Sequence, residues 1–440
     1  MDIDTQDQSG PFEGAEKLLE VWFAPSPAHL PDASSSADGK IGLRKVPREA
    51  WEEMLDIVKC KILSAVEGAE MDAYLLSESS FFVSPHRLIL KTCGTTLNLL
   101  GLPRILEIAR AHAALPSVYR CFYSRKAFMF PERQHGPHRH WRAEVEYLDH
   151  IFPNGAAYTV GKVNGDHWLL YITGPGEDLL GTTAPNSPTP RLAMLPPVGE
   201  IEGPGFEIPG TPDLPDYAKQ DYTIEILMSN LSPTARARFD HASSLDAVDA
   251  GPSQHALELS SSIGISDLFP AHITTLDAYS FTPCGYSSNA LLKWRDDAGT
   301  DPSRSGEGYY TIHVTPEEGW SYASFECNVP LPTIPSTEAT SIPDLKTLIR
   351  RVVNIFQPGR LTLTLFISSE DNANAEEEGG ESAVEAAQRA FKTALISHKG
   401  INGYSGQTDG SFSGRYKRTD KINYEFGGYD LAFATFELRA

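Results

Sequence analysis

The chain has 440 residues, and its hydrophobic fraction of 41% and charged fraction of 22% are typical of globular proteins with a sizeable core. A formal net charge of -21 at pH 7 disfavours phosphate backbones and anionic membranes, so neither nucleic acid nor a membrane is expected as a partner, whereas cationic ligands are favoured. No apolar run is long enough to span a bilayer, and the polar N-terminus predicts a cytoplasmic protein without a signal peptide.

Strand-like segments outnumber helix-like segments along the chain. Strands are predicted over 17–23, 81–90, 117–124, 157–163, 167–173, 222–228, 278–284, 309–315, 321–328, 360–368, 421–426 and 429–438, several with alternating apolar and polar residues. Helices are predicted over 48–65, 103–114, 141–151, 342–356 and 383–396. Many strands and few helices, without strict β-α alternation, predict an α+β fold with antiparallel sheets.

Three segments are predicted to be loops, and no strong sequence repeat is visible. Residues 25–40 are rich in Ser, Ala and Pro, and residues 174–220 form a long insertion full of Pro and Gly. Residues 370–382 are acidic and contain glycine, which predicts a solvated loop.

Neither the cysteines nor the clustered histidines predict a metal site. The five cysteines are far apart in the sequence and include no CxxC pair, which indicates reduced thiols. His135, His138 and His140 are spaced in a way that gives no helical i, i+4 face, so a loop is expected there. No metal is therefore predicted.

The step Glu78-Ser79-Ser80 precedes an apolar, strand-like segment. A serine hydroxyl can attack the preceding carbonyl to give an ester, and removal of the serine Cα proton then eliminates the glutamate carboxylate. The dehydroalanine left behind hydrolyses to a pyruvoyl group and ammonia. This chemistry needs a strained or polarised peptide, a donor for the oxyanion and a base. Taken alone, the step fits a polar turn before a strand.

Four fragments occur in a defined order along the chain. They are Leu-Ser-Glu-Ser-Ser at 76–80, Lys-Thr-Cys-Gly-Thr-Thr at 91–96, Phe-Thr-Pro-Cys-Gly-Tyr-Ser at 281–287 and Ile-His-Val-Thr-Pro-Glu at 312–317. Each is weakly specific, but the ordered set resembles the eukaryotic S-adenosylmethionine decarboxylase proenzymes. The resemblance covers about residues 12–369, apart from the insertion.

The resemblance implies a four-layer αββα sandwich of two antiparallel sheets flanked by helices. It also implies self-cleavage between Glu78 and Ser79 into a β chain, 1–78, and an α chain, 79–440, which stay together in one domain. Ser79 would become the pyruvoyl cofactor that forms a Schiff base with S-adenosylmethionine. A dimer of such αβ units is left open.

The family pattern assigns further roles. Ser287 would assist processing, His313 would remove the Cα proton, and Cys93 would reprotonate the substrate carbon. Glu13 and Glu16 are expected in the active site, Phe12 and Phe281 around the adenine, Glu317 at the ribose, and Leu76 in the substrate site.

Two acidic strand faces fit an activator of this family, the diamine putrescine. Period-two alternation places Glu16 with Glu20, and Asp221 with Thr223 and Glu225. Taken alone, each set fits a solvated face. The resemblance instead implies a putrescine site of Asp221, Thr223, Glu225 and Glu326, which Glu20 and Lys91 link to the catalytic site.

Two other functions remain open at this stage. A non-catalytic relative could bind and regulate an active decarboxylase, although Glu78, Ser79, Cys93, Ser287 and His313 are all present. A hydrolase using Ser287 and His313 is disfavoured, because the chain lacks a nucleophile elbow.

Overall fold

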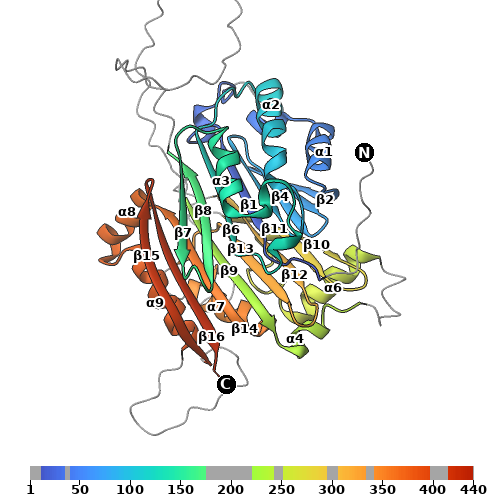
Figure 1. The fold of residues 1–440 in the computed structure, drawn as a ribbon, viewed down its shortest axis with the longest axis vertical. Coiled ribbons are helices and arrows are strands. Elements are labelled where there is room, and N and C mark those ends of the chain that lie inside the picture. Colours follow the sequence, from blue (N-terminus) through green and yellow to red (C-terminus); the bar gives the residue numbers. More distant parts are fainter. Residues whose placement is uncertain are drawn as a thin grey trace, which may run out of the picture.

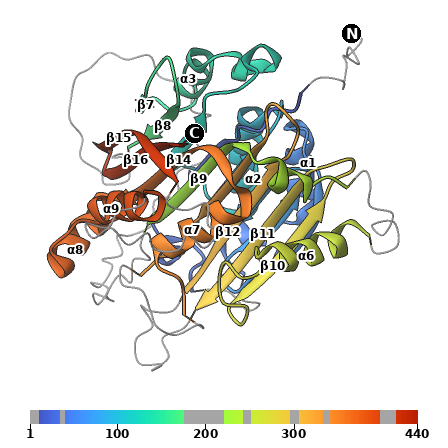
Figure 2. The ribbon, with the colours of Figure 1, turned by 90° about the horizontal axis from the view of Figure 1, so that it is seen from below.

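The computed structural model describes residues 11–34, 40–174, 221–241, 251–294, 306–332, 341–396 and 415–439. Two eight-stranded antiparallel sheets lie face to face, with helices on their outer faces (Figures 1 and 2). This arrangement confirms the expected α+β sandwich. Most of the predicted insertion, 175–220, lies outside the described residues.

The first sheet contains the strands of the N-terminal part of the chain, in the order β2-β3-β4-β5-β1-β6-β8-β7. The strands are β1 (Lys17–Trp22), β2 (Ile62–Glu67), β3 (Asp72–Leu76), β4 (Ser79–Val83), β5 (Arg87–Thr92), β6 (Arg120–Lys126), β7 (Gly155–Gly161) and β8 (His167–Thr173). The sequence prediction merged β4 and β5, which are two strands joined by a turn at Ser84, Pro85 and His86.

The second sheet has the order β10-β11-β12-β13-β9-β14-β16-β15. Its strands are β9 (Tyr222–Leu231), β10 (Thr274–Ser280), β11 (Tyr286–Trp294), β12 (Gly306–Thr315), β13 (Tyr322–Cys327), β14 (Pro358–Ser368), β15 (Tyr416–Phe426) and β16 (Tyr429–Leu438). Counted from its own first strand, this sheet repeats the strand order of the first sheet. The chain thus contains a topological repeat that the sequence did not reveal.

Helices cover the outer face of each sheet. The helices α1 (Arg48–Ile57), α2 (Leu102–Ala113) and α3 (Trp141–Asp149) pack on the first sheet, and α4 (Pro233–Ala237), α6 (Pro252–Ile263), α7 (Leu345–Phe356), α8 (Ser369–Gly379) and α9 (Ala383–Leu395) accompany the second. Short 3-10 helices occur at Pro27–His29, Gly42–Lys45, Asn98–Gly101, Pro131–Arg133 and Gly136–Arg139. The His135–His140 segment, expected as a loop, is therefore mainly a 3-10 turn.

Two further predictions of local structure were wrong. The acidic segment 370–382 was expected to be a loop, but α8 occupies most of it. The Ser368 hydroxyl accepts a hydrogen bond from the Asp371 N–H (3.1 Å) and so caps the helix. The acidic residues in its first turn interact favourably with the helix dipole and stabilise the helix further. The helix predicted over 48–65 ends at Ile57, and β2 follows it.

Side chains alternate along each strand, so each sheet contributes to two cores: one between the sheet and its helices, and one between the two sheets. In β1 and β5, Leu19 and Leu88 face the helices, whereas Leu18 and Ile89 face the other sheet. The two sheets meet through two apolar clusters, one containing Trp22 and the other containing Phe82. Polar side chains of the central strands lie in the middle of the sandwich.

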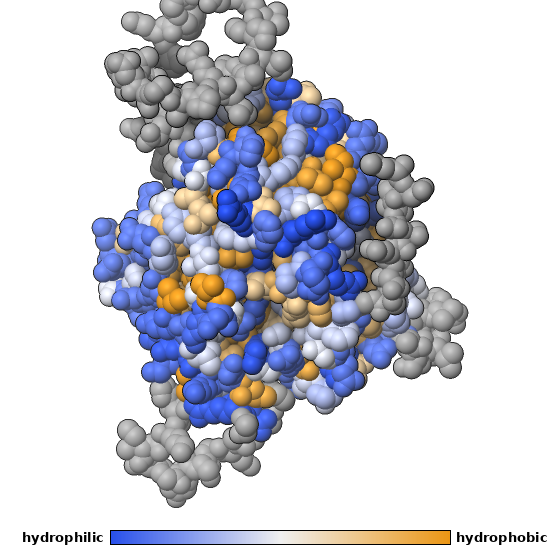
Figure 3. Space-filling view, in the orientation of Figure 1, coloured by the Kyte–Doolittle hydropathy of each residue, from blue (hydrophilic) through white to orange (hydrophobic). Residues whose placement is uncertain are grey.

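One face of the molecule shows how the described side chains are distributed at the surface (Figure 3). The face in Figure 3 is mainly hydrophilic, with small separate apolar patches. Among the described residues, no helix has both the length and the apolarity needed to cross a bilayer.

Charged side chains bind both the N–H groups and the carbonyl groups of the turn between β2 and β3. The Glu307 carboxylate accepts hydrogen bonds from the N–H groups of Ala69 (2.9 Å), Glu70 (2.6 Å) and Met71 (3.0 Å). Opposite it, Arg44 donates to the Ala69 carbonyl (2.7 Å) and pairs with Asp72 (2.7 Å). Because Glu307 belongs to β12, this contact fixes the β2–β3 hairpin of the first sheet against the second sheet.

Replacement of this carboxylate should destabilise the protein. In Glu307→Ala, three backbone N–H groups lose their acceptor, so the free energy of unfolding should fall by about 2 kcal/mol or more. Thermal denaturation at a fixed scan rate measures the effect. Glu318→Ala is the matched control, because the Glu318 side chain is 89% exposed and should leave the midpoint unchanged. Equal midpoints for the two variants would show that the turn does not depend on Glu307.

Candidate functional site

The step Glu78–Ser79 lies at the tip of the β3–β4 hairpin. Leu76 pairs with Ser79, so only Ser77 and Glu78 form the turn. Glu78 has a φ of 56°, in the left-handed region, which costs a residue with a side chain about 1 kcal/mol or more. The structure therefore places backbone strain directly before the predicted cleavage bond.

Two buried thiols flank the Ser79 hydroxyl. The Cys93 N–H donates to Ser79 Oγ (3.3 Å), and the Cys93 and Cys60 sulfurs lie 3.9 and 4.0 Å from that oxygen. The Cys93 thiol also donates to the Glu78 carbonyl. Burial raises the pKa of Cys93 well above its usual value and that of Cys60 to about 11. Both are therefore protonated at neutral pH, and Cys93 can polarise the Glu78 carbonyl.

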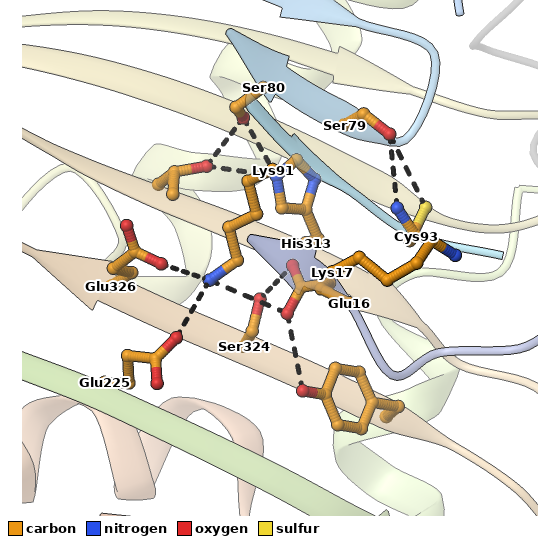
Figure 4. A network of polar contacts seen from close by, with 12 residues as sticks. Glu16, Lys17, Ser79, Ser80, Lys91, Cys93, Glu225, His313, Ser324 and Glu326 are labelled. Atoms are coloured by element: carbon orange, nitrogen blue, oxygen red, sulfur yellow. Dashed lines mark hydrogen bonds and ion pairs between the residues drawn. The ribbon is translucent and has the colours of Figure 1, made fainter. Parts of the chain in front are cut away.

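The His313 ring links two serine hydroxyls, those of Ser80 and Ser287, and Figure 4 shows the contact with Ser80. Ser80 Oγ donates to Asn289 Oδ1 (2.6 Å) and lies 2.9 Å from His313 Nε2, so we assign the ring proton to Nε2. His313 Nδ1 then accepts from the Ser287 hydroxyl (2.9 Å). Burial, followed by the nearby Lys91 ammonium, lowers the pKa of His313 to about 3, so the ring is neutral and keeps a lone pair on one nitrogen. Its direct partner on β4 is Ser80, the residue after Ser79.

The N-terminal segment contributes residues near the junction. Glu13 accepts hydrogen bonds from the N–H groups of Ala15 (3.0 Å) and Phe130 (2.8 Å). The Phe12 ring lies against Gly94, where a Cβ atom would come within 3.1 Å of it. The Phe12 N–H donates to Glu317 (3.1 Å). Phe12 and Glu317 are thus brought together, as the sequence predicted for a substrate site.

Two other predicted substrate residues are placed differently. Phe281 lies on the turn after β10, and its ring packs on Tyr279, with centroids 5.0 Å apart. The Leu76 side chain is fully buried in the apolar core beneath the helices of the first sheet. Leu76 can therefore offer a ligand only its backbone.

The junction residue Glu78 has a perturbed side chain. Burial, followed by the nearby Glu317 carboxylate, raises the pKa of Glu78 to about 7.

Lys91 forms the centre of a buried charge cluster between the sheets (Figure 4). Its ammonium lies 2.5 Å from Glu326 and 3.7 Å from both Glu16 and Glu225. Burial alone would lower the pKa of Lys91, but the three carboxylates raise it, so the ammonium stays charged. Glu16 is further held by the Ser324 hydroxyl (2.7 Å).

The cluster extends toward the edge of the sandwich through a second cation. Arg87 lies 3.1 Å from Glu20 and 3.9 Å from Asp221. Burial raises the pKa of Glu20 and of Glu225 to about 7. Carboxylates outnumber the cations Lys91, Arg87 and Arg120 in this region, and the excess of acidic groups suits an added cationic ligand.

A narrow pocket of about 40 Å³ lies between these carboxylates. Its lining combines acidic and hydroxyl groups with aromatic rings and includes Glu20, Phe122, Ser124, Trp168, Thr223, Glu225, Tyr309, Glu326, Thr364 and Phe366. All the predicted diamine residues lie in or beside this pocket.

Strand pairing connects the charge cluster to the junction. Lys91 is opposite Ser80 across β4 and β5, and Ser324 is opposite His313 across β12 and β13. Glu16 bonds to Ser324 on β13 and contacts Lys91 on β5, so the cluster reaches the two strands that pair with those carrying the Ser80–His313 contact.

Several residues of this site were missed by the sequence analysis. Lys17 is fully buried and donates to the Gly94 carbonyl (2.8 Å), next to Cys93, and burial lowers its pKa to about 8. Asn289 and Arg87 act through partners far along the chain. Only the lysine gave a signal, as a charged residue next to Glu16 at the start of a strand that is apolar apart from Glu20.

Within the described ranges, no group of three or more His, Cys, Asp or Glu side chains is arranged to hold a metal ion. The central histidine of the 135–140 segment has a structural partner instead. His138 is fully buried and bonds to Glu144 (2.8 Å), which also binds Arg125.

Comparisons with known proteins agree with this geometry. A family model described as adenosylmethionine decarboxylase matches residues 9–437. The chain is 38% identical to an S-adenosylmethionine decarboxylase proenzyme of Xenopus laevis over 81% of this chain and 83% of the relative. It is 34% identical to a proenzyme of that name from Drosophila melanogaster, over 97% and 95%, and 33% identical to one from Saccharomyces cerevisiae, over 84% and 85%. The chain therefore belongs to the adenosylmethionine decarboxylase family.

Proposed function

We propose that this chain is a self-processing, pyruvoyl-dependent S-adenosylmethionine decarboxylase. Its products would be CO₂ and decarboxylated S-adenosylmethionine, which supplies spermidine and spermine synthesis. The observation that carries the proposal is the Glu78–Ser79 junction, where a left-handed residue precedes a buried serine and a thiol donates to the intervening carbonyl. Membership of the family supports the same activity.

Self-cleavage follows from these contacts. The Ser79 hydroxyl attacks the Glu78 carbonyl, Cys93 stabilises the developing oxyanion, and the amide becomes an ester with the nitrogen of Ser79 released as an amine. His313 is the base proposed for the Cα proton of Ser79. Elimination then frees Glu78 as a carboxylate, and hydrolysis of the dehydroalanine releases ammonia. The chain 1–78 would end at Glu78, and the chain 79–440 would begin with the pyruvoyl group.

The two chains should remain associated after cleavage. Strands β1, β2 and β3 belong to the short chain, and β1 pairs with β5 and β6 of the long chain while β3 pairs with β4. Extraction of the short chain would break these ladders and expose the core. We propose an αβ unit of this kind in the cytoplasm; a dimer of such units is compatible with it.

The residues around Ser79 fit a pyruvoyl group, since the precursor serine is buried among proton donors. Once formed, the pyruvoyl group supplies a carbonyl electron sink for the loss of CO₂. Cys93 would donate the proton to the substrate carbon, because its thiol is protonated and adjacent. Phe12, Phe281 and Glu317 would bind the adenine and ribose, and Glu13 and Glu16 would favour the cationic substrate.

The first test concerns processing. Wild-type protein should separate into two fragments on a denaturing gel, and Ser79→Ala should stay intact because the nucleophile is absent. His313→Ala should accumulate the ester, since elimination lacks its base, and hydroxylamine should then split it. The buried His138→Ala variant is a matched control for loss of a histidine, and should process whenever it folds. Intact wild-type protein would instead favour a non-catalytic relative that binds and regulates an active decarboxylase.

We also propose that putrescine binds among Asp221, Thr223, Glu225 and Glu326. Two ammonium groups would offset the excess of carboxylates, and the methylenes would lie against the aromatic lining of the pocket. Glu20 and Lys91 would transmit this change in charge to Glu16 and to the Ser80–His313 contact. The activator would thus act on processing, decarboxylation or both.

The pH dependence of putrescine binding follows from the raised pKa values of Glu20 and Glu225. Between about pH 4.5 and 7, Glu20 and Glu225 hold more protons in the folded protein than in the unfolded chain. As pH rises through that range, these two carboxyls therefore lower the stability of the diamine-free protein. Putrescine favours the ionised forms, so binding releases protons. Its stabilising shift in melting temperature should therefore be larger at pH 8 than at pH 6.

Asp221→Asn should lose most of this shift and most of the stimulation of activity. The exposed Asp56→Asn on α1 is the matched control and should respond like the wild type. An equal shift at both pH values, or equal stimulation of both variants, would show that the acidic cluster is not the diamine site.

A further inference from the structure

The carboxylate of Glu317 has two fixed donors on one of its oxygens. Glu317 Oε2 accepts hydrogen bonds from the Phe12 backbone N–H (3.1 Å) and from the indole N–H of Trp320 (3.0 Å). Among the described residues no hydrogen-bond donor contacts Oε1, and Glu317 is only half-buried. The two donors therefore orient the carboxylate and leave Oε1 as its free acceptor.

The turn between β12 and β13 makes this contact possible. Trp320 follows Glu317 by three residues, and Gly319 has a φ of 91°, which folds the chain back so that the indole reaches the carboxylate. The Trp320 ring is held edge-on by Phe130, with centroids 5.9 Å apart. Phe130 in turn donates its N–H to Glu13. The indole is thus fixed at the rim of the same site.

We infer that Trp320 is a positioning residue that aims Glu317 at the hydroxyl groups of the substrate ribose. The inference rests on the proposed function and deepens it by adding a residue that acts through Glu317. Phenylalanine at this position would keep the ring contact with Phe130 but would remove the N–H. Glu317 would then keep one fixed donor and could rotate away from the ribose.

The test compares kinetics of the purified, processed enzyme with two substrates. In Trp320→Phe, KM for S-adenosylmethionine should rise about five- to tenfold, while kcat and the extent of processing stay unchanged, because Glu317 does not touch the reacting carbon. With the 2′-deoxyribose analogue of the substrate, the variant and the wild type should differ much less. In a Glu317→Gln background, Trp320→Phe should add little.

Trp294→Phe is the matched control, because this half-buried tryptophan packs on Gly306 at the far end of β12 and should leave both KM values unchanged. An equal rise in KM for both substrates would overturn the inference, because Trp320 would then support the overall shape of the site rather than the contact of Glu317 with the ribose. An unchanged KM would overturn it as well. Absence of turnover in processed wild type would contradict the proposed function itself, which separates the two failures.

Discussion

The buried ammonium of Lys91 is the interaction on which the middle of this sandwich depends. Two sheets that pack face to face normally bury apolar side chains, but here Glu16, Glu225 and Glu326 point into the space between them. Each carboxylate would be costly there without a cation, and Lys91 serves all three. Because Glu16 comes from one sheet and Glu225 and Glu326 from the other, the pairing also fixes how the sheets face each other.

One cation does not neutralise the cluster. Arg87 offsets Glu20 and Asp221, yet the raised pKa values of Glu20 and Glu225 show that negative charge remains unfavourable there. The same excess that destabilises the ligand-free protein at higher pH is what would favour a diamine. Since Lys91 on β5 lies opposite Ser80 on β4, the charge cluster and the junction are carried by neighbouring, hydrogen-bonded strands.

The sequence could predict the class of fold, because that class depends on local patterns; the Glu78–Ser79 junction, identified from short motifs, remains a prediction. Period-two alternation placed Glu16 with Glu20 and Asp221 with Glu225, but alternation alone also fits solvated faces, and only the family resemblance indicated an inward site. In the structure Glu16 and Glu225 are buried, and Glu20 and Asp221 are largely buried beside Arg87. The roles of these residues remain predictions.

Other features could not be read from the chain. Ser80 and Asn289 are partners across the two sheets, and Arg87 reaches Asp221 beside the second sheet, so these contacts depend on how the sheets face each other rather than on neighbours in sequence. Helix α8 was missed because the acidic, glycine-containing composition of its segment indicated a loop, and the helix-capping role of Ser368 was not recognised. The topological repeat was invisible, since it lies in the order of strands and leaves no strong repeat in the residues.

The central claim is that a strained Glu78–Ser79 junction converts itself into the cofactor. Intact-mass spectrometry of the purified wild-type protein tests it most directly. The account predicts a short chain ending at Glu78 and a long chain lighter by one ammonia than a chain with a free N-terminal serine. A single full-length mass after prolonged incubation, or a long chain that begins with unmodified Ser79, would contradict it.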